Sequence, residues 1–159
     1  MDTESRISAP IGIVLPSKTV YSPAKPDEAG AKGKPGAPPL KVLIADDHID
    51  VANSLSMLLQ LWGHHTRIAG DGLQAFAAAE VFKPDVVLLD LKMPGLDGYE
   101  VCERVRATAW GRRTLIAAIT GAEDDSLLHK RDQKADFDAR LKKPIDLDVL
   151  KKLITSLRN

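Results

Sequence analysis

An unbroken apolar run that ends in a carboxylate constrains the fold of this chain more than any other feature. Residues 86–89 read VVLL, Asp90 follows directly, and a Met-Pro-Gly turn signal lies within the next five positions. Such a run, bounded by a turn, is typical of a strand that is buried on both faces of a parallel sheet. Asp90 is therefore expected at the carboxyl end of a central strand, where open α/β sheets bind their ligands. A buried charge there costs on the order of several kcal/mol unless a cation or hydrogen bonds compensate it.

Around this strand, apolar runs alternate with apolar residues at helical spacing. The runs predict strands at 41–45, 65–69, 86–89, 114–119 and 137–141. Helical spacing, with Gly63 and Pro84 as stop signals, predicts helices at 49–62, 72–83, 98–107, 123–134 and 147–157. The expected core-facing residues are Val51, Leu55, Leu58, Leu59 and Trp62 in the first helix, Leu73, Phe76, Ala77 and Val81 in the second, and Leu147, Leu150, Leu153, Ile154 and Leu157 in the last.

The alternation of strand and helix predicts the fold class. Strands joined through helices by short links form a parallel sheet with right-handed crossovers and helices on both faces. We therefore expect an α/β, doubly wound, flavodoxin-like sheet of five parallel strands in the order 2-1-3-4-5. In this order the first and third strands flank the point where the winding reverses, and ligands collect at that point.

The first 39 residues differ in composition from the rest. They contain seven of the ten prolines and four glycines, so we expect a flexible tail at 1–39 and one folded domain at 40–159. The chain has 22 basic and 22 acidic residues, which gives no reason to expect nucleic acid or an anionic membrane as a partner. No apolar run is long enough to span a membrane. The single cysteine, Cys102, excludes an internal disulfide and suits the reducing cytoplasm, and we expect it to face the core.

Polar residues follow four of the five predicted strands. Asp46 and Asp47 follow the first, Asp90 the third, Thr120 the fourth and Lys143 the fifth. Three converging carboxylates would raise one another's pKa values unless a cation lies among them. Hard oxygen ligands of this number favour Mg²⁺ that keeps several waters and can bind phosphate oxygens. Together with a lysine and a hydroxyl, the set predicts a site at which Asp90 receives a phosphoryl group.

Four sequence segments carry a resemblance to a known family. They are IADDHID, DLKMPGLDG, AAITG and LKKPID, and in combination they are highly specific. Over residues 40–159 the chain resembles the receiver domain of two-component response regulators. The segments GYEVCERVR and ADFDARLKKPID are most similar to receivers attached to hybrid histidine kinases.

The resemblance implies a role for each residue at the strand ends. Asp90 would accept phosphate from a phosphohistidine, and Mg²⁺ would be bound by the carboxylates of Asp47 and Asp90 and the backbone carbonyl of Lys92. Asp46 would act mainly through water and by orienting Lys143. Lys143 would pair with the phosphoryl oxygens, and its peptide bond to Pro144 would be cis, as it often is in the family.

The resemblance also implies a switch and a set of partners. Thr120 would move toward the bound phosphoryl group and bias a two-state equilibrium in the fourth helix and fifth strand. The family often has an aromatic residue or histidine at the position of Arg140, so here we expect Arg140 to pair with an acid on the output face or on a partner. Asp136 stands where glycine is expected, which predicts a turn held by an aspartate hydrogen bond. The expected partners are a sensor histidine kinase or a histidine phosphotransfer protein, and a downstream protein that binds the face of helix 4, strand 5 and helix 5.

Three other functions were weighed. A Mg²⁺-dependent phosphohydrolase with an aspartate nucleophile usually needs a second acid two residues further on, and this chain has Lys92 there. A receiver-like binding module that is never phosphorylated would not need the set of Asp47, Asp90, Thr120 and Lys143. Flavin binding lacks a Ser/Thr/Gly-rich phosphate loop after the first strand. We therefore expect a signalling switch whose only chemistry is its own phosphorylation and dephosphorylation, with no appended DNA-binding or enzymatic domain.

Overall fold

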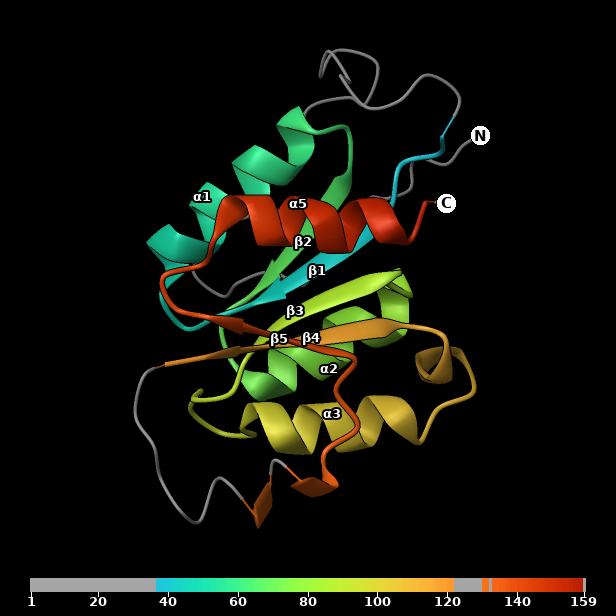
Figure 1. Ribbon diagram of the computed structural model, residues 1–159. Coiled ribbons are helices and arrows are strands. Elements are labelled where there is room, and N and C mark those ends of the chain that lie inside the picture. Colours follow the sequence, from blue (N-terminus) through green and yellow to red (C-terminus); the bar gives the residue numbers. More distant parts are fainter. Residues whose placement is uncertain (1–36, 122–129, 132, 159) are drawn as a thin grey trace.

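The sheet of the folded part has the predicted order. The computed structural model describes residues 37–121, 130–131 and 133–158, and its five strands are parallel in the order β2-β1-β3-β4-β5 (Figure 1). This confirms the flavodoxin-like α/β fold. The strands are β1 (Lys41–Ala45), β2 (His65–Ala69), β3 (Val86–Asp90), β4 (Leu115–Thr120) and β5 (Ala139–Lys142).

Helices cover both faces of this sheet. On one face lie α1 (Ile49–Leu61) and α5 (Leu147–Ser156), and on the other α2 (Gly72–Phe82) and α3 (Gly98–Arg106) (Figure 1). A short 3₁₀ helix, η4 (Trp110–Arg112), precedes β4 and was not predicted. Most of the helix expected at 123–134 falls outside the described residues, as do residues 1–36 of the expected tail. The remaining tail residues touch the domain, because the Arg158 side chain donates a hydrogen bond to the Ala37 carbonyl at 2.7 Å.

The central strand divides the core into two layers. All five residues of β3 are buried, as its apolar sequence predicted. Val86 and Leu88 pack on the side of α1 and α5, whereas Val87 and Leu89 pack on the side of α2 and α3. Successive side chains of a strand point to opposite faces, so a strand covered on both sides must be apolar throughout. Cys102 is 2% exposed in the second layer, as expected, and burial raises the pKa of its thiol to about 11.

The prediction for the buried face of α2 was wrong at three of its four positions: Leu73, Ala77 and Val81 are exposed, whereas Phe76 is partly buried against the core. Leu73 and Val81 are 60% and 75% exposed, and the buried positions are Gly72, Ala75, Ala78 and Ala79. The reason is close packing: a Cβ atom at Gly72 would lie 1.8 Å from the Leu96 carbonyl oxygen. Small side chains let a helix approach its neighbours, and α2 is apolar almost all round, so spacing alone does not identify the inner face.

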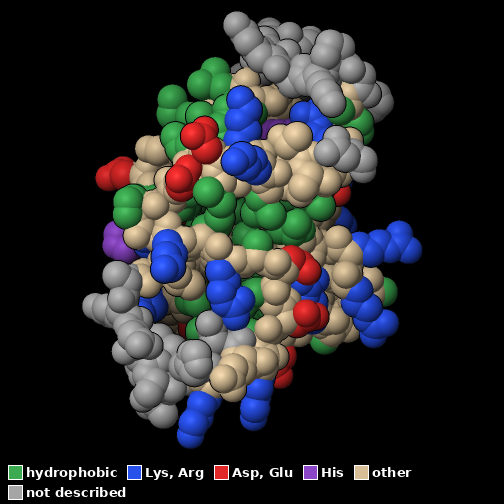
Figure 2. Space-filling view, in the orientation of Figure 1, with side chains coloured by type: hydrophobic (Ala, Val, Ile, Leu, Met, Phe, Trp, Pro, Cys, Tyr) green, Lys and Arg blue, Asp and Glu red, His purple; other side chains and the backbone are tan. Residues whose placement is uncertain are grey.

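Three other residues expected in the core are exposed. Val51 of α1 is 45% exposed, Leu147 of α5 is 48% exposed, and Leu157 just after α5 is 39% exposed. The buried residues of α5 are Leu150 and Ile154. Val51 and Leu147 instead line a groove beside the strand ends. On the face that α5 crosses, hydrophobic side chains gather in the middle, with Lys and Arg side chains around them (Figure 2).

Strand β5 begins two residues later than predicted. The Asp138 side chain takes the place of a strand carbonyl, accepting a hydrogen bond from the Ile116 backbone N–H at 2.8 Å. The Asp138 backbone N–H donates in turn to the Ile116 carbonyl at 2.9 Å. These two hydrogen bonds join the residue before β5 to β4, and the regular pairing of the two strands starts one residue later, at Ala139.

Candidate functional site

Two buried carboxylates lie side by side at the point where the sheet winding reverses. Asp46 follows β1 directly and Asp90 is the last residue of β3, and these two strands are paired up to Ala45 and Leu89. Asp46 is 1% exposed and Asp90 is 3% exposed. Both acids directly follow fully buried strand residues, Ala45 and Leu89, and so lie at the buried end of these two central strands.

Lys143 provides the positive charge between these acids. Its Nζ atom lies 3.2 Å from Asp90 Oδ2 and 4.0 Å from Asp46 Oδ2. The backbone N–H of Lys143 donates to the Thr120 carbonyl at 2.8 Å, which ties the loop after β5 to the end of β4. The Lys143–Pro144 peptide bond is cis, as the resemblance to receiver domains implied.

The surroundings of Asp90 raise the pKa of its carboxyl group. Burial raises the pKa of Asp90, and the negative charge of Asp46 raises it further. The Lys92 backbone N–H, which donates to Asp90 Oδ1 at 3.1 Å, and the Lys143 ammonium oppose this increase. An additional cation would therefore stabilise the ionised form of Asp90.

The donor set fits a small hard cation. One ligand atom from each of Asp46, Asp47, His48 and Asp90 lies within 4.8 Å of the others. The Asp46 Oδ2 atom is buried and accepts no hydrogen bond from the described residues. Since a buried carboxylate oxygen without a partner is costly, this atom is suited to a metal ion or a metal-bound water. Three carboxylates match the oxygen preference of Mg²⁺.

His48 was not identified from the sequence. Its Nδ1 atom lies 3.2 Å from Asp46 Oδ1 and 3.2 Å from Asp47 Oδ1. The imidazole thus contacts both acids of the pair, and its backbone N–H also donates to Asp46 Oδ1 at 2.9 Å. The available signal was its place directly after the two aspartates.

The other predicted site residues lie around this centre. Lys92 is exposed and begins the turn after β3, and Thr120 is half-buried at the end of β4, one residue beyond the partner of Asp90 in the strand register. The guanidinium of Arg140 in β5 lies 5.2 Å from the centre of the Phe137 ring. This contact with an aromatic ring leaves the predicted pairing of Arg140 with an acid as a prediction.

The Asp136 turn is held by an arginine, which also contacts the carboxylate of Asp136: Arg106 Nε lies 3.3 Å from Asp136 Oδ2. Arg106 fixes this segment: its Nε donates to the Asp136 carbonyl at 3.0 Å, and one of its terminal nitrogens donates to Asp138 Oδ2 at 2.6 Å. The same guanidinium donates to the carbonyls of Gly111 and Thr114. The hydrogen bonds that hold this turn therefore come from an arginine of α3, a residue that the sequence analysis did not single out.

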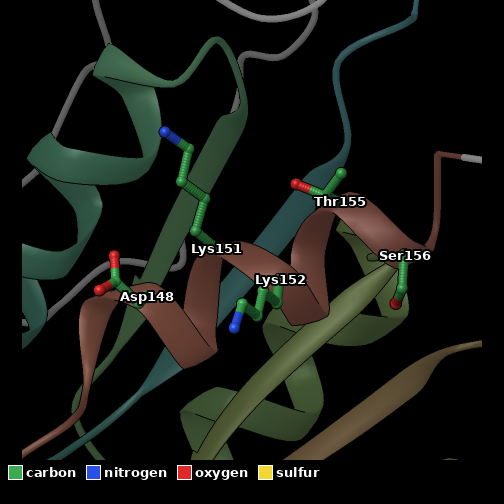
Figure 3. A pocket seen from close by; sticks show the side chains of 5 residues that line it. All are labelled: Asp148, Lys151, Lys152, Thr155 and Ser156. Atoms are coloured by element: carbon green, nitrogen blue, oxygen red, sulfur yellow. The ribbon is translucent and has the colours of Figure 1, made fainter.

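A groove extends from the acidic centre along α1. A cavity of about 710 Å³ is lined by Asp46, His48 and Lys143 at one end and by apolar residues, among them Val51 and Leu147, beside it. A second cavity, of about 490 Å³, runs along the outer side of α5 (Figure 3). Its lining residues, Asp148, Lys151, Lys152, Thr155 and Ser156, fan out along one helix and do not converge on a common point (Figure 3). The groove at α1 is therefore the one that belongs to the strand-end site.

None of the helices among the described residues has the length and apolar composition that crossing a membrane requires.

Comparison with known proteins gives a consistent result. Residues 42–155 match the response regulator receiver domain family. The chain is 37% identical over 84 residues to the DNA-binding response regulator MtrA of Mycobacterium tuberculosis, covering 53% of this chain and 37% of that protein. It is 31% identical over 123 residues to the sensor histidine kinase AtsR of Burkholderia thailandensis, covering 76% of this chain and 20% of the kinase. The chain thus spans well under half the length of these two relatives.

A solved structure with the same fold is the receiver domain of a sensor histidine kinase from Pseudomonas aeruginosa, with a magnesium ion coordinated in its active site cleft. The two chains are 28% identical with a TM-score of 0.65, and the match covers 74% of this chain and 96% of the other.

Proposed function

Because this chain belongs to the response regulator receiver domain family, we propose that it is the phosphoacceptor switch of a two-component phosphorelay and that Asp90 takes the phosphoryl group. One observation carries the proposal. Asp90 lies buried among acids, and the Lys143 ammonium is 3.2 Å from its Oδ2 atom. A lysine held beside a buried carboxylate at the point of winding reversal is suited to bind an incoming phosphoryl group.

The chemistry needs little more than position and charge. An Asp90 oxygen attacks the phosphorus of a phosphohistidine, the P–N bond breaks, and the imidazole nitrogen leaves with the electron pair. Lys143 faces Asp90 Oδ2 and neutralises charge that develops on the phosphoryl oxygens. The Lys92 N–H holds Asp90 Oδ1, which leaves the carboxylate in one orientation. Water later attacks the same phosphorus and restores the carboxylate.

Magnesium fits the acidic centre. Asp46, Asp47 and Asp90 would hold the ion together with the Lys92 carbonyl, Asp46 partly through water. When bound, Mg²⁺ neutralises charge on the phosphoryl oxygens and on the clustered carboxylates. The partnerless Asp46 Oδ2 and the magnesium of the similar Pseudomonas aeruginosa receiver support this assignment.

The switch would start at Thr120. Its hydroxyl lies at the end of β4, and β4 is paired with β5 up to Thr120 and Lys142. Movement of Thr120 toward the phosphoryl group would shift β5, where Arg140 lies over Phe137. The output face predicted from the sequence consists of the helix expected at 123–134, most of which lies outside the described residues, together with β5 and α5. Val149 of α5 and Leu157, just after it, are exposed hydrophobic residues at this end of the chain.

We propose that the phosphodonor, a sensor histidine kinase or a histidine phosphotransfer protein, docks in the groove along α1. Val51 and Leu147 are about half exposed there, beside the acids that must meet the phosphohistidine. The similarity to the kinase AtsR supports a kinase-linked receiver. The MtrA relative is DNA-binding, but this chain covers 37% of it, and we propose protein partners alone, in the cytoplasm.

The test is phosphorylation by a small phosphodonor. The protein is incubated with Mg²⁺ and acetyl phosphate, and its intact mass is measured. We expect one added phosphate on the wild type and on Asp148→Asn, a matched change at an exposed acid of α5. We expect none on Asp90→Asn. A phosphate on Asp90→Asn at the wild-type rate contradicts the proposal.

A further inference from the structure

Arg131 binds the first turn of α3 from a distant part of the chain. Its two terminal nitrogens donate to the two carboxylate oxygens of Asp97, at 2.7 and 3.0 Å, across 34 residues of sequence. Asp97 is the N-cap of α3, and its side chain also accepts a hydrogen bond from the Glu100 N–H. Paired, bidentate bonds of this kind fix orientation as well as distance.

The same guanidinium covers an aromatic side chain of that turn. The Arg131 Cζ atom lies 4.4 Å from the centre of the Tyr99 ring. Tyr99 is 7% exposed and packs with Leu91 at the end of β3 and Ala118 in β4. Arg131 therefore holds two residues of the α3 start, one through charge and one through its planar face.

The start of α3 presses directly on the phosphoacceptor backbone. The Gly98 N–H donates to the Leu91 carbonyl at 3.2 Å. A Cβ atom at Gly98 would lie 2.6 Å from the Asp90 carbonyl oxygen, so there is no space between this turn and the end of β3. In such close packing, a shift of the α3 start must move Asp90 and the Lys92 amide that binds it.

The ion pair between Arg131 and Asp97 lowers the pKa of Asp97, although both side chains are partly exposed to solvent. Burial opposes ionisation of Asp97, but the hydrogen bonds from Arg131 and from the Glu100 N–H hold the pKa of Asp97 below its usual range. The Arg131 and Asp97 side chains are 43% and 28% exposed, so the contact is moderate in strength.

We propose that Arg131 is a positioning residue for the phosphoacceptor site: by clamping Asp97 and Tyr99 it keeps the β3–α3 loop in the geometry that aligns Asp90 and Lys92. The inference rests on the proposed function of Asp90, and it adds a residue from the segment between β4 and β5 to the site. Two consequences of this contact can be measured separately: the mobility of the α3 start without metal, and the affinity of the site for Mg²⁺.

The experiment compares Arg131→Met, Asp97→Asn and the double variant with the wild type. Methionine keeps the aliphatic length of the arginine, and asparagine keeps the helix cap. Lys130→Met is the matched control, since it removes an exposed positive charge from the adjacent residue. One readout is hydrogen exchange of the Gly98 amide without metal. The other is the Mg²⁺ dissociation constant, followed by the NMR shift of the Lys92 amide.

We expect Gly98 exchange to become about threefold to tenfold faster, and Mg²⁺ binding about twofold to fivefold weaker, in both single variants. Removing the positive charge of Arg131 should by itself tighten cation binding, so weaker binding in Arg131→Met is specific to lost alignment. Asp97→Asn removes a negative charge, which by itself weakens cation binding, so for this variant Gly98 exchange is the deciding readout. The double variant should bind Mg²⁺ no more weakly than the single variant with the lower affinity, because the two changes remove the same contact. Lys130→Met should keep the wild-type exchange rate of Gly98 and should not weaken Mg²⁺ binding, and Arg131→Lys should show only part of the effect of Arg131→Met.

The inference is overturned if Arg131→Met matches Lys130→Met in both readouts, even if its melting temperature falls. That result assigns Arg131 a structural role only. If the wild type itself binds no Mg²⁺, the proposed metal site fails, and Gly98 exchange still decides whether the clamp exists.

Discussion

The Nζ atom of Lys143 lies 3.2 Å from Oδ2 of Asp90, although 53 residues separate the two in sequence. With Asp90 Oδ1 bound by the Lys92 N–H, both oxygens of the buried carboxylate are engaged. The contact compensates a charge that burial and Asp46 would otherwise make unfavourable. It also places a cation where the phosphoryl oxygens of the proposed reaction would be.

The first prediction concerns this lysine. Lys143→Met should slow phosphorylation of Asp90 by about 100-fold, the usual effect of removing one charged donor from a developing anion. The initial rate with acetyl phosphate and saturating Mg²⁺ measures it. Lys142→Met, at the exposed neighbouring position, is the control and should keep the wild-type rate. Equal rates for the two variants would remove Lys143 from the reaction.

A second prediction follows from the raised pKa of Asp90. A carboxyl group with a raised pKa in the folded state favours folding at low pH, and this contribution is lost as pH rises through the folded-state value. At pH 7, Asp90→Asn should therefore be more stable than the wild type, with a free energy of unfolding higher by on the order of 1 kcal/mol. The difference should shrink as pH falls toward 4. Urea unfolding at several pH values tests this, and a variant less stable at pH 7 would show that Asp90 is not under electrostatic strain.

Magnesium should stabilise the fold through the same acids. At a concentration ten times its dissociation constant, Mg²⁺ should add about 1.4 kcal/mol to the free energy of unfolding. Asp47→Asn should lose most of this gain, whereas Asp50→Asn, an exposed acid in the first turn of α1, should retain it. Thermal unfolding with and without Mg²⁺ provides the measurement. An equal response of the two variants would exclude Asp47 as a ligand.

Arg106 should be among the most sensitive positions for stability. It is 13% exposed and donates to Asp138 and to backbone carbonyls of three segments. Arg106→Ala leaves these acceptors unpaired, so the free energy of unfolding should fall by about 3 kcal/mol. Arg104→Ala, also in the last turn of α3 but exposed, should change it by less than about 0.5 kcal/mol. Urea unfolding compares them, and similar losses would contradict the role of Arg106.

The sequence was informative where burial and chain punctuation act together. The apolar run before Asp90 indicated a strand covered on both faces, so its end located Asp90 as one residue of the site. The acids after β1, the threonine after β4 and the lysine after β5 follow from the same argument, since carboxyl ends of parallel strands share one edge.

The misses have a different physical origin. The inner face of α2 depends on how closely the helix approaches Leu96, and a helix that is apolar on most sides carries no signal for this. Arg106 and Arg131 both act through partners about 30 residues away. For Arg106 these are the Asp136 carbonyl and the Asp138 carboxylate, and for Arg131 the N-cap Asp97 and the Tyr99 ring. Hydrogen bonds of this kind leave no periodic pattern, so the residues resemble ordinary surface cations in the sequence.

The most direct test of the central claim is to identify the residue that carries the acyl phosphate. The protein is phosphorylated with acetyl phosphate and Mg²⁺, reduced with borohydride, which converts a phosphoaspartate to homoserine, and digested for peptide sequencing by mass spectrometry. The account predicts homoserine at position 90 and aspartate at positions 46 and 47. Homoserine at position 46 or 47 with aspartate retained at position 90 would contradict it.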